Sequence, residues 1–86
     1  MRVILIYDVN VKRVTKIMKI CREYLEHIQN SVFEGDLTDA NLKELKMRLK
    51  EVINPEEDSV IIFRLWNSNY KKEIIGIEKN SMDNII

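Results

Sequence analysis

The residues of this chain that are best suited to chemistry lie close together near its N-terminus. Asp8 ends an apolar run, and four basic residues follow it closely: Lys12, Arg13, Lys16 and Lys19. A carboxylate at the end of a strand often accepts hydrogen bonds from backbone amides, which is a structural role. Basic side chains that recur every three or four positions share one face of a helix, where they either face water or bind phosphate groups. As a phosphate-binding row they need a second copy of the chain to reach the length of a duplex.

The composition excludes several other kinds of site. The single cysteine, Cys21, rules out an internal disulfide and a cysteine-based zinc cage. The single histidine, His27, argues against a metal site built from several histidines. The 14 basic and 14 acidic residues give a net charge of zero, which argues against strong non-specific binding of nucleic acid. Residues 1–22 nevertheless hold six basic residues against one acid, which predicts a basic face.

The length of 86 residues predicts one domain, which we place at residues 1–78, followed by a tail at 79–86. The apolar runs Val3–Tyr7 and Val60–Phe63 are too short to cross a bilayer, and the first residues do not resemble a signal peptide. We therefore expect a cytoplasmic protein with no membrane partner. A chain this small buries only about 60–65% of its unfolded surface, so association with a second copy is an obvious source of stability.

Hydrophobic periodicity predicts alternating strands and helices. The residues from Arg2 to Asp8 enclose five apolar or aromatic positions with no polar residue between them, which is typical of a buried strand. An apolar stripe at helical spacing follows, and Asn10 is a suitable N-cap for it. The expected elements are a strand at 2–8, a helix at 11–26, two short strands within 27–37 that meet near Asn30, a helix that Thr38 caps and Asn54-Pro55 ends, a strand at 60–66 and a last strand at about 70–77.

This order is that of a ferredoxin-like α+β fold, βαββαβ, with an extra C-terminal strand. In that fold two helices cover one face of an antiparallel sheet. In the first strand Val3, Leu5 and Tyr7 point to one face, and Ile4 and Ile6 point to the other. Because both sets are apolar, helices on one face leave an apolar face open to water. We therefore expect a homodimer through the face away from the helices.

The last expected strand, at about 70–77, is too apolar for a free tail. Lys71-Lys72-Glu73 interrupts its apolar residues in the way that charged residues protect an edge strand. A tight hairpin before it would favour Asn-Gly, but the connecting residues are Asn67-Ser68-Asn69. We therefore expect this strand to pair with the partner subunit rather than with its own chain.

Four short segments of the sequence resemble a known protein family. They are Tyr7-Asp8, Lys12-Arg13, Gln29-Asn30-Ser31-Val32-Phe33-Glu34-Gly35 and Pro55-Glu56-Glu57-Asp58-Ser59-Val60. In their order and spacing, from residue 1 to about 66, they resemble CRISPR-associated protein 2. The two longer runs together are quite specific for that family.

The resemblance implies a function in CRISPR adaptation. Members of the family form homodimers and work with the integrase, CRISPR-associated protein 1, in capturing foreign DNA as new spacers. They are also described as metal-dependent nucleases that hydrolyse phosphodiester bonds in RNA or double-stranded DNA. By the same resemblance Asp8 is the catalytic residue and the Mg²⁺ ligand, and Lys12, Arg13 and Lys16 are candidate contacts to nucleic acid. Two copies of Asp8 near a two-fold axis would supply two of the carboxylates that hydrated Mg²⁺ prefers.

Three functions remain open at this point. A dimeric bridge between integrase copies needs no cleavage, whereas a phosphodiesterase needs Asp8 and magnesium. The alternative is a toxin-like messenger-RNA interferase of related fold, which acts without an integrase.

Overall fold

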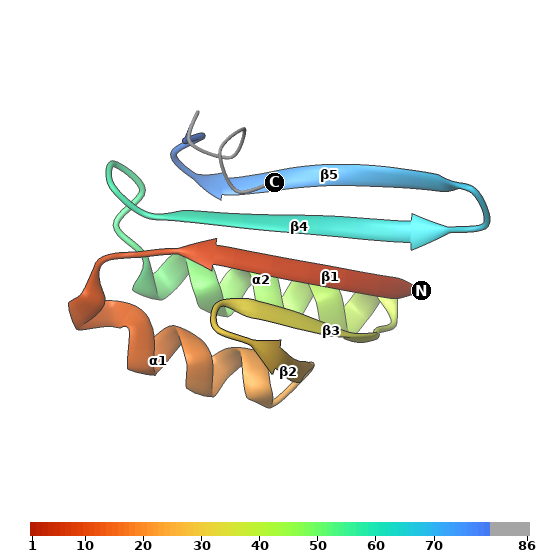
Figure 1. Cartoon of the computed structure of the whole chain (residues 1–86), viewed down its shortest axis with the longest axis horizontal. Helices are drawn as coiled ribbons and strands as arrows, with labels where there is room; N and C mark the ends of the chain where they lie inside the picture. The colour runs from red at the N-terminus through yellow and green to blue at the C-terminus, as the bar shows by residue number, and fades with distance from the viewer. Residues whose placement is uncertain (80–86) are drawn as a thin grey trace.

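The computed structural model describes residues 1–79 as five strands and two helices (Figure 1). In chain order these are β1 (Arg2–Asp8), α1 (Val11–Arg22), β2 (Glu26–Gln29), β3 (Val32–Asp36), α2 (Asp39–Val52), β4 (Ser59–Trp66) and β5 (Asn69–Gly76). The strands form one sheet in the order β2-β3-β1-β4-β5, and every neighbouring pair is antiparallel. This topology confirms the ferredoxin-like α+β fold with an extra strand. No helix among these residues is long and apolar enough to span a membrane.

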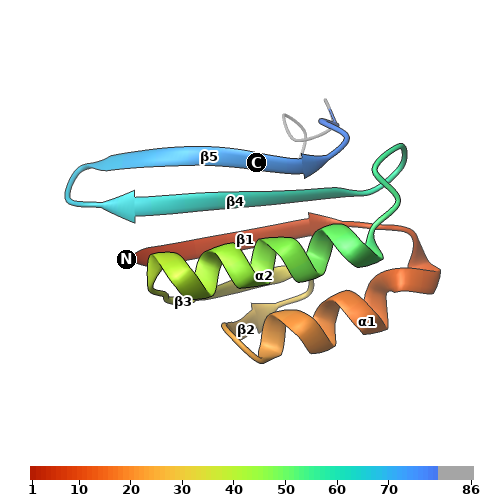
Figure 2. The same cartoon turned by 180° about the vertical axis from the view of Figure 1, so that it is seen from behind.

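Both helices lie on the same face of the sheet. The strand β1 passes in front of α2 in Figure 1, and α2 passes in front of β1 when the molecule is seen from behind in Figure 2. Val3, Leu5 and Tyr7 share one face of β1, as predicted; this face is turned toward the helices, and the three side chains are at most 5% exposed. The register places seven apolar side chains on the other face: Ile4, Ile6, Val32, Ile61, Phe63, Leu65 and Ile74. We call this surface the open face, because neither helix covers it.

The core fills the space between the sheet and the two helices. Its helical members are Ile17, Ile20 and Cys21 from α1 and Leu42, Leu45 and Leu49 from α2. They recur every three or four residues, so each helix turns one apolar side toward the sheet. Both predicted N-caps are confirmed, since Asn10 and Thr38 accept hydrogen bonds from backbone N–H groups in the first turns of α1 and α2.

The first helix ends about one turn before its predicted end, at Arg22. The backbone N–H groups of Tyr24 and Leu25 both donate to the carbonyl of Cys21, at 3.1 and 2.8 Å, and this tight turn leads directly into β2. Leu25 is buried although it lies in the turn after α1 and not in the helix itself. Its side chain packs against Gly35 of β3. A Cβ at Gly35 would lie 3.1 Å from Leu25 Cδ2. This glycine therefore permits a close approach of Leu25 to β3.

In the single chain of this structure the last strand pairs with β4, and its expected pairing with a partner subunit stays a prediction. The register of β5 on β4 is continuous from the pair Ser59–Gly76 to the pair Trp66–Asn69. The turn between the strands has only two residues, and the first of them, Asn67, has a φ of 53°. Asparagine tolerates this left-handed conformation better than most residues, so the hairpin closes without the Asn-Gly pair that tight hairpins favour. The outer edge of β5 is the free edge on this side of the sheet.

Candidate functional site

The candidate site lies where β1 ends. This strand carries Asp8 to one end of the open face, and Ser59 at the start of β4 is its partner in the register. On the other side of β1, the carbonyl of Ser31 accepts a hydrogen bond from the backbone N–H of Tyr7 at 3.1 Å. The end of β1 therefore lies between the start of β4 and the turn that joins β2 to β3, although the Asp8 side chain is 62% exposed.

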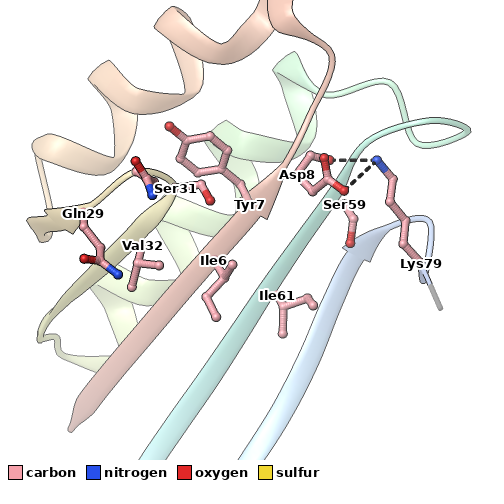
Figure 3. Close-up of a pocket in the computed structure, with 10 residues that line it drawn as sticks. Ile6, Tyr7, Asp8, Gln29, Ser31, Val32, Ser59, Ile61 and Lys79 are labelled. Atoms are coloured by element: carbon pink, nitrogen blue, oxygen red, sulfur yellow. Dashed lines mark hydrogen bonds and ion pairs between the residues drawn. The ribbon is translucent and has the colours of Figure 1, made fainter. Parts of the chain in front are cut away.

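A pocket of about 310 Å³ opens beside Asp8, and we call it the Asp8 pocket (Figure 3). Its apolar residues lie along the strands, and its polar residues gather where the strands end. The lining consists of Ile6, Tyr7, Val32 and Ile61 together with Asp8, Gln29, Asn30, Ser31, Ser59 and Lys79. The hydroxyl oxygen of Ser59 is buried and has no hydrogen-bond partner within residues 1–79. A concave surface with an apolar part and a few convergent polar groups is typical of a ligand-binding site.

Lys79 closes one side of the Asp8 pocket. Its Nζ lies 3.3 Å from Asp8 Oδ2 and donates a hydrogen bond to the Asp8 carbonyl at 3.1 Å; both are dashed in Figure 3. This lysine comes from the chain just after β5, 71 positions away from Asp8. It is the first residue of the predicted tail at 79–86, and the other residues of that segment lie outside the described residues. No local sequence pattern could have connected residues so far apart.

Arg13, a predicted nucleic-acid contact, is held in an internal ion pair. Its side chain is only 16% exposed, its Nε lies 2.5 Å from Asp58 Oδ2, and it also pairs with Glu57. The Asp58 carboxylate is fully buried and accepts two further hydrogen bonds of 2.8 Å, from the backbone N–H groups of Asn10 and Asn54. Burial alone would raise the pKa of Asp58, but the hydrogen bonds from Arg13, Asn54 and Asn10 outweigh it and lower that pKa to about 2.

This ion pair joins the start of α1 to the loop before β4. Asp58 ends this loop and Ser59 begins β4, and both polar residues are buried. The partners Arg13 and Asp58 are 45 positions apart, so neither helical nor strand periodicity indicates their contact. The structure therefore gives Arg13 a positioning role, because it holds the segment that directly follows Asp8.

The other predicted nucleic-acid contacts, Lys12 and Lys16, are exposed on α1. Lys16 and Lys19 line a groove between the two helices, which Arg48 and Glu23 also border as an ion pair. None of these three lysines lines the Asp8 pocket. The structure thus separates the two groups that the sequence placed together, with the carboxylate on the sheet and the basic row on the helical layer.

The oxygen ligands that the described residues offer at Asp8 make up only part of a magnesium site. Mg²⁺ prefers several oxygen ligands in octahedral geometry and keeps some of its water. Within residues 1–79, no three histidine, cysteine, aspartate or glutamate side chains gather closely enough to hold a metal. Asp8 offers one exposed carboxylate, with Lys79 beside it. No other carboxylate among residues 1–79 lines the Asp8 pocket, so a second carboxylate ligand has to come from outside these residues.

The chain is similar to proteins of one family. The family model described as CRISPR associated protein Cas2 matches residues 1–73. A CRISPR-associated endoribonuclease Cas2 of Archaeoglobus fulgidus is 51% identical over 78 residues, which cover 90% of this chain and 85% of that protein. Its counterpart from Dictyoglomus turgidum is 46% identical over an alignment of 87 residues that covers 100% of both chains. The crystal structure of Streptococcus pyogenes Cas2 at pH 6.5 matches with a TM-score of 0.72 and 35% identity, over 79% of this chain and 89% of that one.

Proposed function

The chain belongs to the family of CRISPR-associated protein Cas2, and from this premise we propose that it is a dimeric subunit of CRISPR adaptation that also hydrolyses phosphodiester bonds. The dimer bridges copies of the integrase, CRISPR-associated protein 1, while foreign DNA is captured as new spacers in the cytoplasm. The substrate of hydrolysis is RNA or double-stranded DNA. The relatives from Archaeoglobus fulgidus and Dictyoglomus turgidum are named endoribonucleases, which supports the nuclease part of the proposal.

The observation that carries the proposal is the position of Asp8 at the end of the open face. An apolar sheet face of this extent favours contact with another protein surface. A second copy is the simplest partner, because a two-fold axis joins identical patches. When the axis passes close to the end of β1, one Asp8 from each copy borders the same cleft. Dimer formation and the completion of the catalytic site are then one event.

The two Asp8 carboxylates together suit a hydrated magnesium ion better than the single Asp8 carboxylate of one chain does. When bound, magnesium lowers the pKa of a coordinated water and stabilises negative charge on a phosphate. The role of the protein is to hold both Asp8 side chains at the cleft. The ion pair of Arg13 with Asp58 supports this by fixing the start of α1 next to Asp8.

The exposed lysines of α1 contact the nucleic acid backbone. Because Arg13 is engaged with Asp58, Lys12 and Lys16 are the proposed phosphate contacts. On double-stranded DNA, each neutralised phosphate changes the slope of log K against log salt by about −0.9. With so few contacts per copy the dimer binds weakly by itself, and the integrase supplies the remaining affinity.

The test compares the wild type with Asp8→Asn, and Asp36→Asn is the matched control. Asp36 is an exposed aspartate at the opposite end of the sheet, where it pairs with Arg2. We expect Asp8→Asn to lose magnesium-dependent cleavage and Asp36→Asn to retain it, while both keep the dimer mass in light scattering. Spacer integration with the integrase should survive Asp8→Asn, because bridging needs the dimer and not the carboxylate. Equal cleavage by Asp8→Asn and the wild type would contradict the catalytic role of Asp8.

A further inference from the structure

We propose that five basic side chains on α2, β4 and β5 bind the phosphate backbone of duplex DNA without reading its bases. We call this surface the α2–β5 patch, and its members are Lys43, Lys46, Lys50, Arg64 and Lys71. The inference rests on the proposed function, in which the dimer holds double-stranded DNA. It adds a contact region that lies apart from the Asp8 pocket and from the lysines of α1.

One side of α2 carries three lysines at helical spacing. Lys43, Lys46 and Lys50 line a groove of about 290 Å³ together with Met47, which is itself exposed. Within residues 1–79, only Lys46 of the three lysines forms an ion pair. Like charges at these spacings repel one another and disfavour an isolated helix. The stability of the helix therefore does not explain the row, whereas an anionic ligand would offset the repulsion.

The acids of α2 do not neutralise this row. Glu44 accepts a hydrogen bond from the Tyr24 hydroxyl, and Glu51 lines the groove between the two helices, so both acids lie toward α1 and the turn after it. Asp39 precedes Lys43 by four residues, but it lies in the first turn, where it complements the helix dipole, and no ion pair joins the two. The helix thus separates its charges, with acids on the side of α1 and lysines on the side of β5.

The patch continues from α2 onto β5 through Glu73. The carboxylate of Glu73 pairs with Lys46 of α2 and lies 2.8 Å from Nη2 of Arg64. The hydrogen bond from Lys46 outweighs burial and lowers the pKa of Glu73, and the charges of Arg64 and Lys71 lower it further. Arg64 and Lys71 are opposite each other in the register of β4 and β5. One carboxylate therefore lies among five cations, which leaves an excess of four positive charges.

Dimer formation leaves the patch open to solvent. Glu73 is opposite Ile62, which belongs to the core between the sheet and the helices, so Glu73 and Lys71 point to the helix side of β5. The open face is the other side of the sheet, and neither helix passes in front of β5 in Figure 2. Lys43, Lys50 and Lys71 are exposed, and a second copy on the open face would not cover them.

Phosphate groups suit this patch better than a protein surface does. Protein interfaces are depleted in lysine and have an apolar centre, whereas surfaces that bind DNA are polar and strongly positive. Because an α-helix rises about 1.5 Å per residue, Lys43 and Lys50 are about 10 Å apart along α2. A strand of duplex DNA carries one phosphate per ~3.4 Å of helix axis, so about three phosphates pass over this length. Contacts to phosphates alone hold a duplex in place and carry no sequence information.

The experiment measures binding of a fluorescent DNA duplex by anisotropy, in EDTA and over a range of salt concentrations. The variants are Lys50→Gln and the double variant Lys43→Gln/Lys50→Gln. Each lost phosphate contact should flatten the slope of log K against log salt by about 0.9. Because the affinity varies as that power of the salt concentration, one lost contact should weaken binding about eightfold at ~0.1 M salt. We expect this change for Lys50→Gln, and about twice the change in slope for the double variant, for each copy that touches the duplex.

Two controls separate the patch from the net charge and from the fold. Arg22→Gln removes the same charge from an exposed residue of α1 outside the groove between the helices, and it should leave the affinity and the slope nearly unchanged. Lys43→Arg/Lys50→Arg keeps both positive charges and should bind as the wild type does. A loss as large as that of the glutamine pair would contradict a role of charge. Light scattering checks that every variant keeps the mass of the dimer.

Three further results would overturn the proposal. The first is equal affinity and slope for Lys50→Gln and Arg22→Gln, and the second is no measurable binding of the duplex by the wild type at low salt. The third is tighter binding of polyglutamate than of the duplex, which would assign the patch to an acidic protein. None of these measurements needs cleavage. If the wild type cleaves nothing but its binding depends on Lys43 and Lys50, the proposed hydrolysis fails and the patch is supported.

Discussion

The buried ion pair between Arg13 and Asp58 predicts a defined pH dependence of folding stability. Folding lowers the pKa of Asp58 from 3.8 to about 2, so the folded state binds a proton less readily than the unfolded state. A group of this kind stabilises the fold above its unfolded pKa and loses that contribution as the pH falls toward its folded pKa. Since one pKa unit corresponds to about 1.4 kcal/mol, the ionised carboxylate contributes about 2 kcal/mol above pH ~5, and most of it is lost by pH ~2.

The assay is urea unfolding followed by circular dichroism, at one fixed protein concentration because dimer formation also contributes to stability. The measured quantity is the difference in unfolding free energy between the wild type and Asp58→Asn. Other acids titrate alike in both proteins, so their contributions cancel. We expect this difference to shrink by about 2 kcal/mol between pH ~5 and pH ~2. For Asp36→Asn, the difference in unfolding free energy from the wild type should change little over the same pH range, because the Asp36 side chain is 74% exposed. A difference for Asp58→Asn that stays constant over this range would refute the reasoning.

Two further substitutions test the backbone and the open face. Gly76 has a φ of 89°, and a Cβ there would lie 2.1 Å from the Asp58 carbonyl oxygen, so Gly76→Ala should lower the unfolding free energy by about 2 kcal/mol or more. A urea midpoint equal to that of the wild type would show that this close approach is absent. Ile4→Lys places a charge on the open face opposite Glu34, and light scattering should then report a monomer. Met47→Lys on α2 should leave the dimer intact, and a dimeric Ile4→Lys would place the interface elsewhere.

The parts of the fold that the sequence predicted are those that depend on local patterns. The uninterrupted apolar residues of β1 and the helical stripes of α1 and α2 come from neighbours along the chain, and so do the caps at Asn10 and Thr38. The end of α1 was predicted less well, because it depends on the contact of Leu25 with Gly35 in another strand. The two-residue hairpin before β5 was not predicted, because its turn is Asn67-Ser68 and lacks the Asn-Gly pair that such hairpins favour.

Of the residues at the candidate site, the sequence indicated only Asp8, through the family resemblance. Its contact with Lys79 and the pairing of Arg13 with Asp58 join residues 71 and 45 positions apart. Charged residues give no periodic signal that would distinguish a solvated side chain from a buried one. For this reason the sequence predicted Arg13 as a phosphate contact, although the structure pairs it with Asp58.

The central claim is that one catalytic site takes an Asp8 from each of two copies, and cleavage by mixed dimers tests it most directly. The wild type and Asp8→Asn are coexpressed at equal levels, so that both chains assemble at random into dimers. Magnesium-dependent cleavage of an RNA oligonucleotide is then measured as a rate per chain. If both carboxylates are needed, only dimers with two wild-type chains are active, and the rate falls to about one quarter. A fall to about one half would mean that each chain acts alone, and cleavage that does not fall at all would contradict the assignment of Asp8.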